Sequence, residues 1–324
     1  MAPKPEETFS PTGVLYENDE VIITEKIPEK STTTTGKQEI IWSNLIIQIV
    51  IHIFALWGLV RIFTSAKLTT TIYGFIIYEI SMMGTMAGVH RLWAHRTYKA
   101  KLPLKLLLAV FATLAAQKSI IDWARDHRVH HRYSDTDADP HNAKRGFFYA
   151  HFGWQFMKKH PEVIKKGTSV DFSDLFADPI LSFQHKHYWL LQFTSYLLPA
   201  FIPMLLWNET FFNGFCINWL RYELGIHSTF SINSFSHLMG HKPYDKYIGP
   251  TENLFVSIIS HGEGWHNYHH TFPWDYRAGE KGQWNPALYF INFFAKIGWA
   301  YDLKKANAGS VENRLKKTGD GSRQ

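Results

Sequence analysis

The chain has 324 residues, of which 45% are hydrophobic and 16% aromatic, and its net charge is +6 with histidines counted as neutral. Its apolar residues are gathered into long runs, a distribution typical of integral membrane proteins. The single cysteine, Cys216, excludes an internal disulfide. Much of the positive charge lies between residues 90 and 187, and we attribute it to membrane topology rather than to nucleic-acid binding.

Four apolar runs are long enough to cross a bilayer, since a spanning helix needs about 20 apolar residues. The predicted spans are residues 42–60, 68–89, 188–207 and 211–234.

The segments outside these runs have other expected roles. The apolar stretch 101–116 is shorter, so an interfacial or re-entrant helix is expected there. Residues 1–40 and 306–324 are polar and are expected to be tails. The folded domain is therefore predicted to cover residues 41–305.

The number of spans fixes the sidedness of the soluble segments. With four crossings, both termini, residues 90–187 and residues 236–305 lie on one side of the membrane. Lysine and arginine are concentrated there, so the positive-inside rule makes that side cytosolic. The predicted fold is an all-α integral membrane protein, with four transmembrane helices under a cytosolic helical cap.

Histidines repeat with one spacing in the two cap segments. The sequence H-x-x-H-H occurs at residues 127–131 and again at residues 266–270. On a helix, residues i, i+3 and i+4 share one face, so each group directs three imidazoles to one place. Neutral imidazole is the commonest metal ligand among side chains. The topology puts both groups on the same side of the membrane, where they can form one metal-binding region.

A looser pair, His90 and His95, precedes both groups. Residues five apart diverge by about 140° on an α-helix, so the pair is expected either to contact different metal ions or to be separated by the helix end. With the two repeats it makes eight histidines, too many for one tetrahedral site and suitable for two metal ions. Imidazole suits iron and copper, and two irons beside a membrane suggest oxygen activation on a lipid-like substrate.

A further histidine and three aspartates near these groups have roles that the sequence alone does not decide. His237 ends the fourth predicted span, and Asn233 lies one turn earlier. Considered without the other histidines, His237 is interpreted as a helix-end residue that the helix dipole stabilises. Asp135, Asp137 and Asp139 either add carboxylate ligands or, as we expect, act as turn and cap residues before a proline.

The remaining histidines and the charges of the fourth span are interpreted structurally. Isolated histidines are expected to be surface or satisfied core residues, namely His52, His160, His185, His187 and His241. Arg221, Glu223 and His227 are costly in lipid and should face the protein interior. Glu223 and His227 are one turn apart, so they can pair.

Three motifs carry a resemblance to a known family. HRLWAH at residues 90–95, RDHRVHH at 125–131 and GEGWHNYHH at 262–270 resemble the three histidine boxes of the membrane-bound acyl-CoA desaturases, with the stearoyl-CoA desaturase group most similar. The resemblance covers about residues 40–305. KKTGDGS at residues 316–322 is similar to insect members, especially the moth enzymes that make pheromone precursors.

The resemblance implies a di-iron site in the cytosolic cap of an endoplasmic reticulum membrane protein. It implies two iron ions, molecular oxygen as co-substrate, and Asn233 acting through a water. The implied iron ligands are His90, His95, His127, His130, His131, His237, His266, His269 and His270.

The resemblance also implies an acyl-CoA substrate, with its head group on the cytosolic surface and its chain in a buried, kinked tunnel. Positions matching the substrate contacts are Asn44, Tyr78, Met82, Lys118, Arg125, Asp126, Lys158, Lys159, Thr229 and Phe230. The family commonly has asparagine where this chain has Lys118, tryptophan at Phe230 and a small residue at Met82. The larger Met82 predicts a shorter tunnel and a preference for chains of fourteen or sixteen carbons.

The predicted activity is therefore oxygen-dependent desaturation of a fatty acyl-CoA, with electrons from cytochrome b5 and its NADH-dependent reductase. Fatty-acid or sex-pheromone precursor synthesis is the expected role. One alternative is a di-iron hydroxylase, acetylenase or conjugase on the same scaffold. A less favoured alternative is a membrane metal-binding or transport protein, because such proteins place ionisable residues in several spans and here only the fourth span has a cluster.

Overall fold

The computed structural model describes residues 38–323, and most of the predicted tail 1–40 lies outside the described residues. The chain forms, in order, α1 (Trp42–Thr64), α2 (Leu68–Met83), η2 (Gly84–Ala94), β1 (Lys99–Ala100), α3 (Leu102–Ala115), α4 (Ile120–Tyr133), η3 (Ala143–Arg145), α5 (Phe147–His151), η4 (Gly153–Gln155), α6 (Pro161–Gly167), α7 (Ser173–Ala177), α8 (Pro179–Lys186), α9 (Tyr188–Trp207), α10 (Phe211–Leu238), α11 (Leu254–Ile259), α12 (His266–Thr271), α13 (Pro286–Lys296), β2 (Ala300–Tyr301) and α14 (Ala308–Lys317). The predicted all-α class is confirmed, since the two strands have only two residues each.

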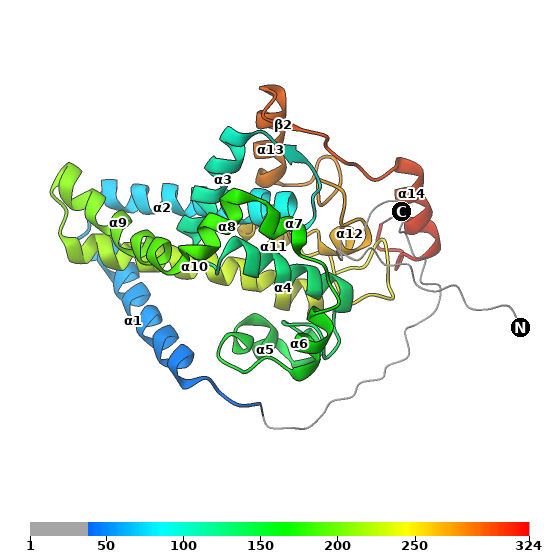
Figure 1. Cartoon of the computed structure of the whole chain (residues 1–324), viewed down its shortest axis with the longest axis horizontal. Coiled ribbons are helices and arrows are strands. Elements are labelled where there is room, and N and C mark those ends of the chain that lie inside the picture. The colour runs from blue at the N-terminus through cyan, green and yellow to red at the C-terminus, as the bar shows by residue number, and fades with distance from the viewer. Residues whose placement is uncertain (1–37, 324) are drawn as a thin grey trace, which may run out of the picture.

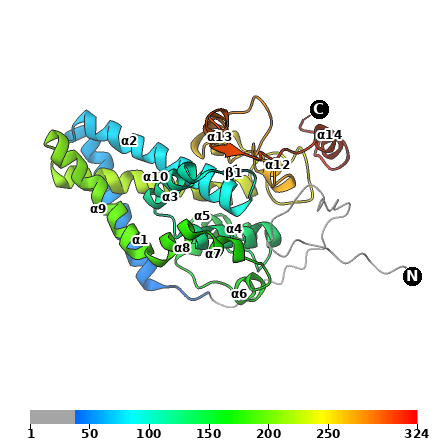
Figure 2. The same ribbon diagram turned by 45° about the horizontal axis from the view of Figure 1, so that its top comes forward.

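The long helices and the short helices occupy opposite ends of the molecule. Figures 1 and 2 show α2 and α9 at one end and α12 and α14 at the other. The helix α10 packs against α1, α2 and α9, and its last turns reach the short helices α11 and α12. It therefore connects the apolar helices to the cap.

Three helices within residues 38–323 are long and apolar enough to cross a membrane. They are α1 with 23 residues, the joined helix Leu68–Ala94 with 27 and α9 with 20. α10 has 28 residues, a length of about 42 Å, but polar residues such as Asn218, Arg221 and Glu223 lower its hydropathy. All three of these side chains are buried, as expected for charges within a span. The fourth crossing along α10 stays a prediction.

The short apolar stretch after the second long helix forms a bent pair. α3 and α4 meet at an angle of 84°, as in a broken span or a re-entrant loop. This geometry agrees with the interfacial or re-entrant helix expected at residues 101–116. The turn begins at Ala116, whose backbone is left-handed with φ 58°.

Arg221 links this bent pair to the long helices. Its guanidinium donates to the carbonyl oxygen of Leu114 at 2.6 Å, to Ser81 Oγ at 3.1 Å and to Asn218 Oδ1 at 2.8 Å. The charge is therefore paired with oxygens from α2, α3 and α10, which makes its burial tolerable.

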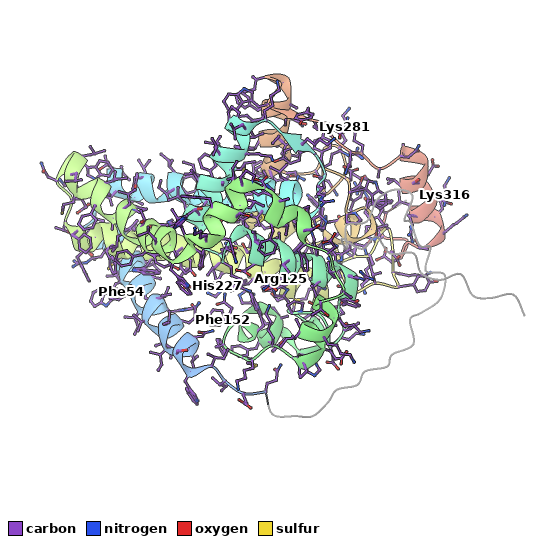
Figure 3. All side chains as sticks on the ribbon, viewed as in Figure 1. Phe54, Arg125, Phe152, His227, Lys281 and Lys316 are labelled. Carbon is purple, nitrogen blue, oxygen red and sulfur yellow. The ribbon has the colours of Figure 1, made fainter. Side chains whose placement is uncertain are left out.

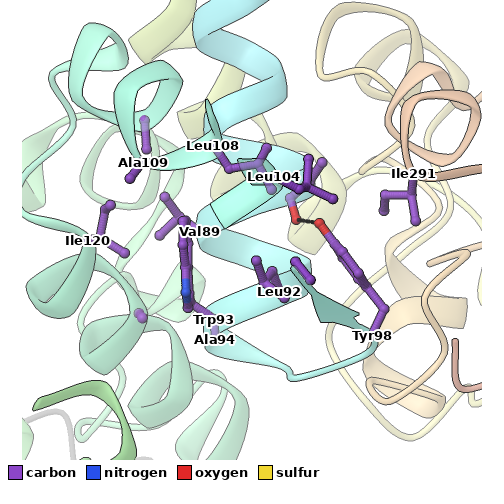
Figure 4. Close-up of a cluster of buried hydrophobic side chains, with 14 of the residues drawn as sticks. Val89, Leu92, Trp93, Ala94, Tyr98, Leu104, Leu108, Ala109, Ile120 and Ile291 are labelled. Atoms are coloured by element: carbon purple, nitrogen blue, oxygen red, sulfur yellow. Dashed lines mark hydrogen bonds between the residues drawn. The ribbon is translucent and has the colours of Figure 1, made fainter. Parts of the chain in front are cut away.

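A buried apolar cluster supports the segment that carries the first histidine pair. Figure 4 shows Val89, Leu92 and Trp93 of η2 packed with Leu104 and Leu108 of α3, among others. The Tyr98 hydroxyl donates to the carbonyl oxygen of Ala87 at 2.8 Å (Figure 4). This packing fixes the direction of the η2 side chains that point away from the cluster.

The C-terminal segment that was expected to be a polar tail contains α14. Val311 and Leu315 of this helix pack against a buried cluster that includes Tyr244 and Phe272. The buried guanidinium of Arg314 lies 3.3 Å from Asp245 Oδ2. Residues 306–318 are thus packed against the cap.

Close contact between η2 and α3 generates a stability prediction. A Cβ added at Gly84 would lie 2.2 Å from the backbone nitrogen of Ala112, whereas one added at Gly167 would meet nothing nearer than 3.8 Å. We expect Gly84→Ala to lower the free energy of unfolding by about 1–3 kcal/mol because the backbones must separate. Thermal unfolding of the detergent-solubilised protein measures this, with Gly167→Ala as the matched control. Equal melting temperatures for the two variants would contradict the close packing.

Candidate metal centre

Nine histidines from four separate segments converge in the cap, next to the end of α10. His90 and His95 come from the end of η2, three histidines from α4, His237 from the end of α10 and three from α12. Their ligand atoms form two groups, each with all atoms within 4.8 Å of one another. The first group is His90, His95, His127, His131 and His269, and the second is His130, His237, His266 and His270.

Each H-x-x-H-H repeat serves both groups. On α4, His127 and His131 lie in the five-histidine group while His130 lies in the four-histidine group. On α12 the division is reversed, since His269 lies in the five-histidine group. Residues i and i+4 of a repeat therefore share one group, and residue i+3 enters the other, as two adjacent sites require.

The five-histidine group brings imidazole nitrogens very close together. His95 Nε2 lies 2.8 Å from His127 Nε2. His269 Nε2 lies 3.0 Å from both His90 Nε2 and His131 Nε2. The Nε2 atoms thus converge on one place, as ligands of a common metal ion do.

The placement of His90 and His95 in one group has a structural cause. η2 is a π-helical stretch of 11 residues, and the amide of His95 donates to the carbonyl oxygen of His90 at 3.1 Å. A hydrogen bond between residues five apart puts them about one turn apart, on the same face. The alternative that the pair contacts different metal ions does not fit, since both histidines lie in the five-histidine group. The alternative that the helix ends between them is confirmed, because η2 ends at Ala94.

The four-histidine group contains a buried nitrogen without a partner. His266 Nε2 lies 3.2 Å from His237 Nε2 and 3.1 Å from His270 Nε2. His130 Nε2 faces the same space, is fully buried and has no hydrogen-bond partner among residues 38–323. An orphaned imidazole nitrogen at such a place fits a metal ligand.

Carboxylates orient the outer nitrogens of three histidines. Asp139 Oδ1 lies 2.9 Å from His130 Nδ1, and Asp135 Oδ1 lies 3.2 Å from His237 Nδ1. Since a carboxylate accepts hydrogen bonds, each Nδ1 carries the proton, and the Nε2 lone pair is left for a metal. Asp135 and Asp139 are thus more than the turn and cap residues that we expected. Asp139 also accepts from the backbone amides of Asp135 and His141, as the expected turn residue does, and Asp137 pairs with Arg145.

A third orienting carboxylate, Glu263, was not identified from the sequence. Its Oε2 lies 3.0 Å from His90 Nδ1, and its Oε1 lies 2.8 Å from the buried Arg91 guanidinium. Burial alone would raise the pKa of Glu263, but the charges of Arg91 and His90 lower it. The available signal was a glutamate placed among glycines, three residues before His266.

Three of the box histidines are held in the neutral form that binds a metal. Burial and repulsion from neighbouring imidazoles hold the pKa of His131, His269 and His270 well below its ordinary value. These imidazoles are therefore neutral and have free lone pairs near pH 7. Burial would also raise the pKa of Asp139, but the His130 charge lowers it to about 2.

Asn233 lies one helical turn before His237 on α10 and is half-buried. Its side chain is thus on the helix face that carries a member of the four-histidine group.

A cationic cluster lies beside the histidines on α4 (Figure 3 labels Arg125). The buried carboxylate of Asp126 accepts from Lys118 Nζ at 2.8 Å and from Lys159 Nζ at 2.7 Å, and Arg125 Nε lies 3.7 Å away. Burial alone would raise the pKa of Asp126, but the two lysines lower it. The structure therefore brings four of the predicted substrate residues together.

The other predicted head-group residues lie on a neighbouring surface. Asn44 Nδ2 donates to the carbonyl oxygen of Gln155 at 3.0 Å, and Lys158 pairs with Glu39. Lys118 Nζ lies 4.6 Å from the ring centre of Trp154, which joins this surface to the cationic cluster.

The predicted tunnel residues lie on two sides of α10. Phe230 packs in a buried cluster with Ile226 and Tyr222, and the Thr229 hydroxyl donates to the carbonyl oxygen of Gly225. Met82 belongs to a different buried cluster, with Tyr78 at its edge.

The orienting carboxylates generate a prediction for metal affinity. We expect Asp139→Asn to weaken metal binding roughly 10- to 100-fold, because the amide no longer fixes the His130 ring and its tautomer. Metal per chain after dialysis against a chelator series measures this. Asp137→Asn is the matched control, and equal retention in both variants would contradict the orienting role.

Comparison with known proteins shows the family of the chain. The fatty acid desaturase family model matches residues 65–278. The chain is 48% identical to an acyl-CoA Delta-9 desaturase of Acheta domesticus, covering 99% of this chain and 92% of that protein. It is also 48% identical to an acyl-CoA Delta(11) desaturase of Spodoptera littoralis, covering 96% and 92%. A (11Z)-hexadec-11-enoyl-CoA conjugase of Bombyx mori is 47% identical over 88% of each chain. The chain therefore belongs to the fatty acid desaturase family.

Proposed function

We propose that this protein is a fatty acyl-CoA desaturase that uses two iron ions and molecular oxygen to introduce a double bond into a long-chain acyl-CoA. The observation that carries the proposal is the division of nine histidines, six of them buried, into groups of five and four ligand atoms. Two adjacent nitrogen-rich sites suit a pair of redox-active metal ions, whereas structural zinc takes four ligands in one closed site.

The residues present fit iron. Burial holds the pKa of six of the nine donors below its ordinary value, so these imidazoles are neutral: His95, His127, His131, His266, His269 and His270. The outer nitrogens of the other three donors lie beside the carboxylates of Asp135, Asp139 and Glu263. When bound, the two irons supply the oxygen-derived oxidizing power needed to remove hydrogen from an unactivated methylene. The protein keeps water out of this region, since His130, His266 and His269 are each at most 2% exposed. The irons would be held by the five- and four-histidine groups, with Asn233 contributing through a water.

Positioning of the substrate would set which methylene reacts. Lys118, Arg125, Lys158 and Lys159 offer cations for the phosphates of coenzyme A, and Asn44 offers an amide. Asp126 holds two of these lysines in place. Thr229 and Phe230 would line the acyl tunnel, and Tyr78 and Met82 would close its end. Fixing the chain in one orientation would give the double bond one position.

The electrons must come from other proteins, since the sequence contains no nucleotide-binding fingerprint. Cytochrome b5 and its NADH-dependent reductase are the donors we propose. The protein would reside in the endoplasmic reticulum membrane, with its termini and histidines on the cytosolic face. The basic charge of residues 90–187 supports this orientation. Synthesis of fatty acids or pheromone precursors is the proposed role.

A conjugase is a second candidate, because a relative of nearly equal identity carries that name. A conjugase and a desaturase share a scaffold and differ in substrate and product. Product analysis therefore separates the two.

Expression in desaturase-deficient yeast tests the proposed reaction. We expect a new monounsaturated fatty acid, with its double bond located by mass spectrometry. His130→Ala should abolish it, because this variant removes a nitrogen that faces the four-histidine group. His241→Ala, at an exposed position, should leave the product unchanged. Iron-loaded protein that yields no product with saturated acyl chains would contradict the proposal, and a conjugated product would favour the second candidate.

Met82 generates a prediction about chain length. Its side chain is fully buried among Met86, Ile232 and Val256. We expect Met82→Ala to shift preference toward longer acyl chains by about two carbons, because each methylene added to an apolar site changes binding by about 0.8 kcal/mol. The ratio of sixteen- to eighteen-carbon products measures the shift, with Met204→Ala on α9 as control. An unchanged ratio would exclude Met82 from the closed end of the tunnel.

A further inference from the structure

A second set of histidines lies outside the nine-histidine centre, between α1 and α10. His52 of α1 and Glu223 and His227 of α10 place their ligand atoms within 4.8 Å of one another. His227 Nε2 lies 3.1 Å from Glu223 Oε2 and 3.3 Å from His52 Nε2. His52 Nε2 lies 3.5 Å from the same Glu223 oxygen. We refer to these three residues as the α1–α10 cluster.

The hydrogen bonds around His227 determine which of its nitrogens carries the proton. The Ser234 hydroxyl donates to the carbonyl oxygen of Phe230 at 3.1 Å, so its oxygen accepts from His151 Nδ1 at 2.9 Å. His151 Nε2 is then an acceptor, and His227 Nδ1 donates to it at 3.0 Å. In neutral His227 the lone pair is therefore on Nε2, which faces the cluster.

A single hydrogen bond determines which nitrogen of His52 carries the proton. Its Nδ1 lies 2.8 Å from the carbonyl oxygen of Gln48, and a carbonyl only accepts, so Nδ1 carries the proton. The Nε2 lone pair of His52 consequently faces the cluster too. Two imidazole lone pairs and one carboxylate then point at one another with no proton between them.

Glu223 makes this arrangement costly unless a cation is present. Its side chain is 6% exposed, and neither carboxylate oxygen has a hydrogen-bond donor among the described residues. A buried carboxylate without a partner is strongly unfavourable. One added proton on an imidazole would bridge a single pair of atoms and leave the third atom unpaired. A metal ion contacts all three at once.

The distances within the cluster match a tetrahedral metal site. Ligands at the usual zinc bond lengths, spaced at tetrahedral angles, are separated by about 3.3–3.5 Å. The separations in the cluster are 3.1, 3.3 and 3.5 Å. Two histidines and a glutamate are also a common zinc ligand set, which leaves the fourth position open.

Neighbouring groups hold the two imidazoles in this geometry. Phe152 packs against both rings, with its centroid 5.2 Å from that of His52 and 5.5 Å from that of His227. Figure 3 shows Phe152 and His227 together on the side where α1 approaches the cap. Both histidine side chains remain partly exposed, at 38% and 37%, so an ion has access.

We propose that His52, Glu223 and His227 bind a divalent cation of the zinc class, separate from the two irons. The ion cross-links α1 to α10, and His151 acts as the partner that orients His227. Water or another small ligand completes the fourth position. This site does not depend on the proposed desaturation, since it shares no ligand with the nine-histidine centre.

Metal analysis of the full-length, iron-loaded protein tests the proposal. The protein is equilibrated with excess zinc chloride, desalted and analysed for iron and zinc by mass spectrometry. We expect the wild type to hold one more zinc per chain than His227→Asn, with equal iron in the two. Any zinc that enters the nine-histidine centre cancels in this difference. His241→Asn, the matched control, should hold as much zinc as the wild type.

A second variant distinguishes loss of the zinc site from misfolding of His227→Asn. Glu223→Gln removes the carboxylate charge at nearly constant volume, so it should also lose the extra zinc. Cobalt substitution adds a spectroscopic readout, because the wild type and not these variants should show the intense visible absorption of tetrahedral Co²⁺. Equal zinc in the wild type, His227→Asn and Glu223→Gln would overturn the proposal. Since iron content and product formation are measured separately, that result would leave the proposed function standing.

Discussion

The structure depends on holding the Nε2 atoms of several imidazoles close together inside the protein. Several Nε2 atoms lie about 3 Å from another Nε2, for example in His95 and His127. Lone pairs at this distance repel, so the arrangement needs both a cation between them and a rigid outer frame. Carboxylates supply part of that frame, and buried guanidiniums supply the rest. Arg128, for example, donates to the carbonyl oxygens of Trp93 and Ala94 and so fixes the end of η2 beside α4.

Departures from regular helix geometry place the ligands. The π-helical turn of η2 aligns His90 with His95, and the 84° bend between α3 and α4 directs the second box toward the first. α10 extends beyond the apolar helices and brings His237 into the cap. Each departure is supported by packing, as in the cluster around Leu104 and Leu108. The metal centre is therefore built on the same packed helices that form the apolar end of the molecule.

Much of the fold and of the metal centre was predictable from sequence periodicity. The remaining features could not be predicted, for reasons that the structure makes clear. The H-x-x-H-H repeats follow from the α-helical period, and the apolar runs have the length of a spanning helix. The convergence of both repeats and three of the long apolar helices were therefore predictable. The partners of His130 and His237 were missed because a loop aspartate gives no periodic signal. His52 was interpreted as isolated because its partners, Glu223 and His227, are about 170 residues away in the chain. Only the packing of α1 on α10 reveals that cluster.

The first quantity to measure is the number of iron ions per chain in purified, catalytically active protein. We expect two irons per chain, because the five- and four-histidine groups each surround one site. Mössbauer spectroscopy of protein loaded with ⁵⁷Fe should resolve two nitrogen-rich environments that differ in ligand number. Full desaturase activity with a single iron per chain, or with none, would show that the two histidine groups do not form a di-iron centre.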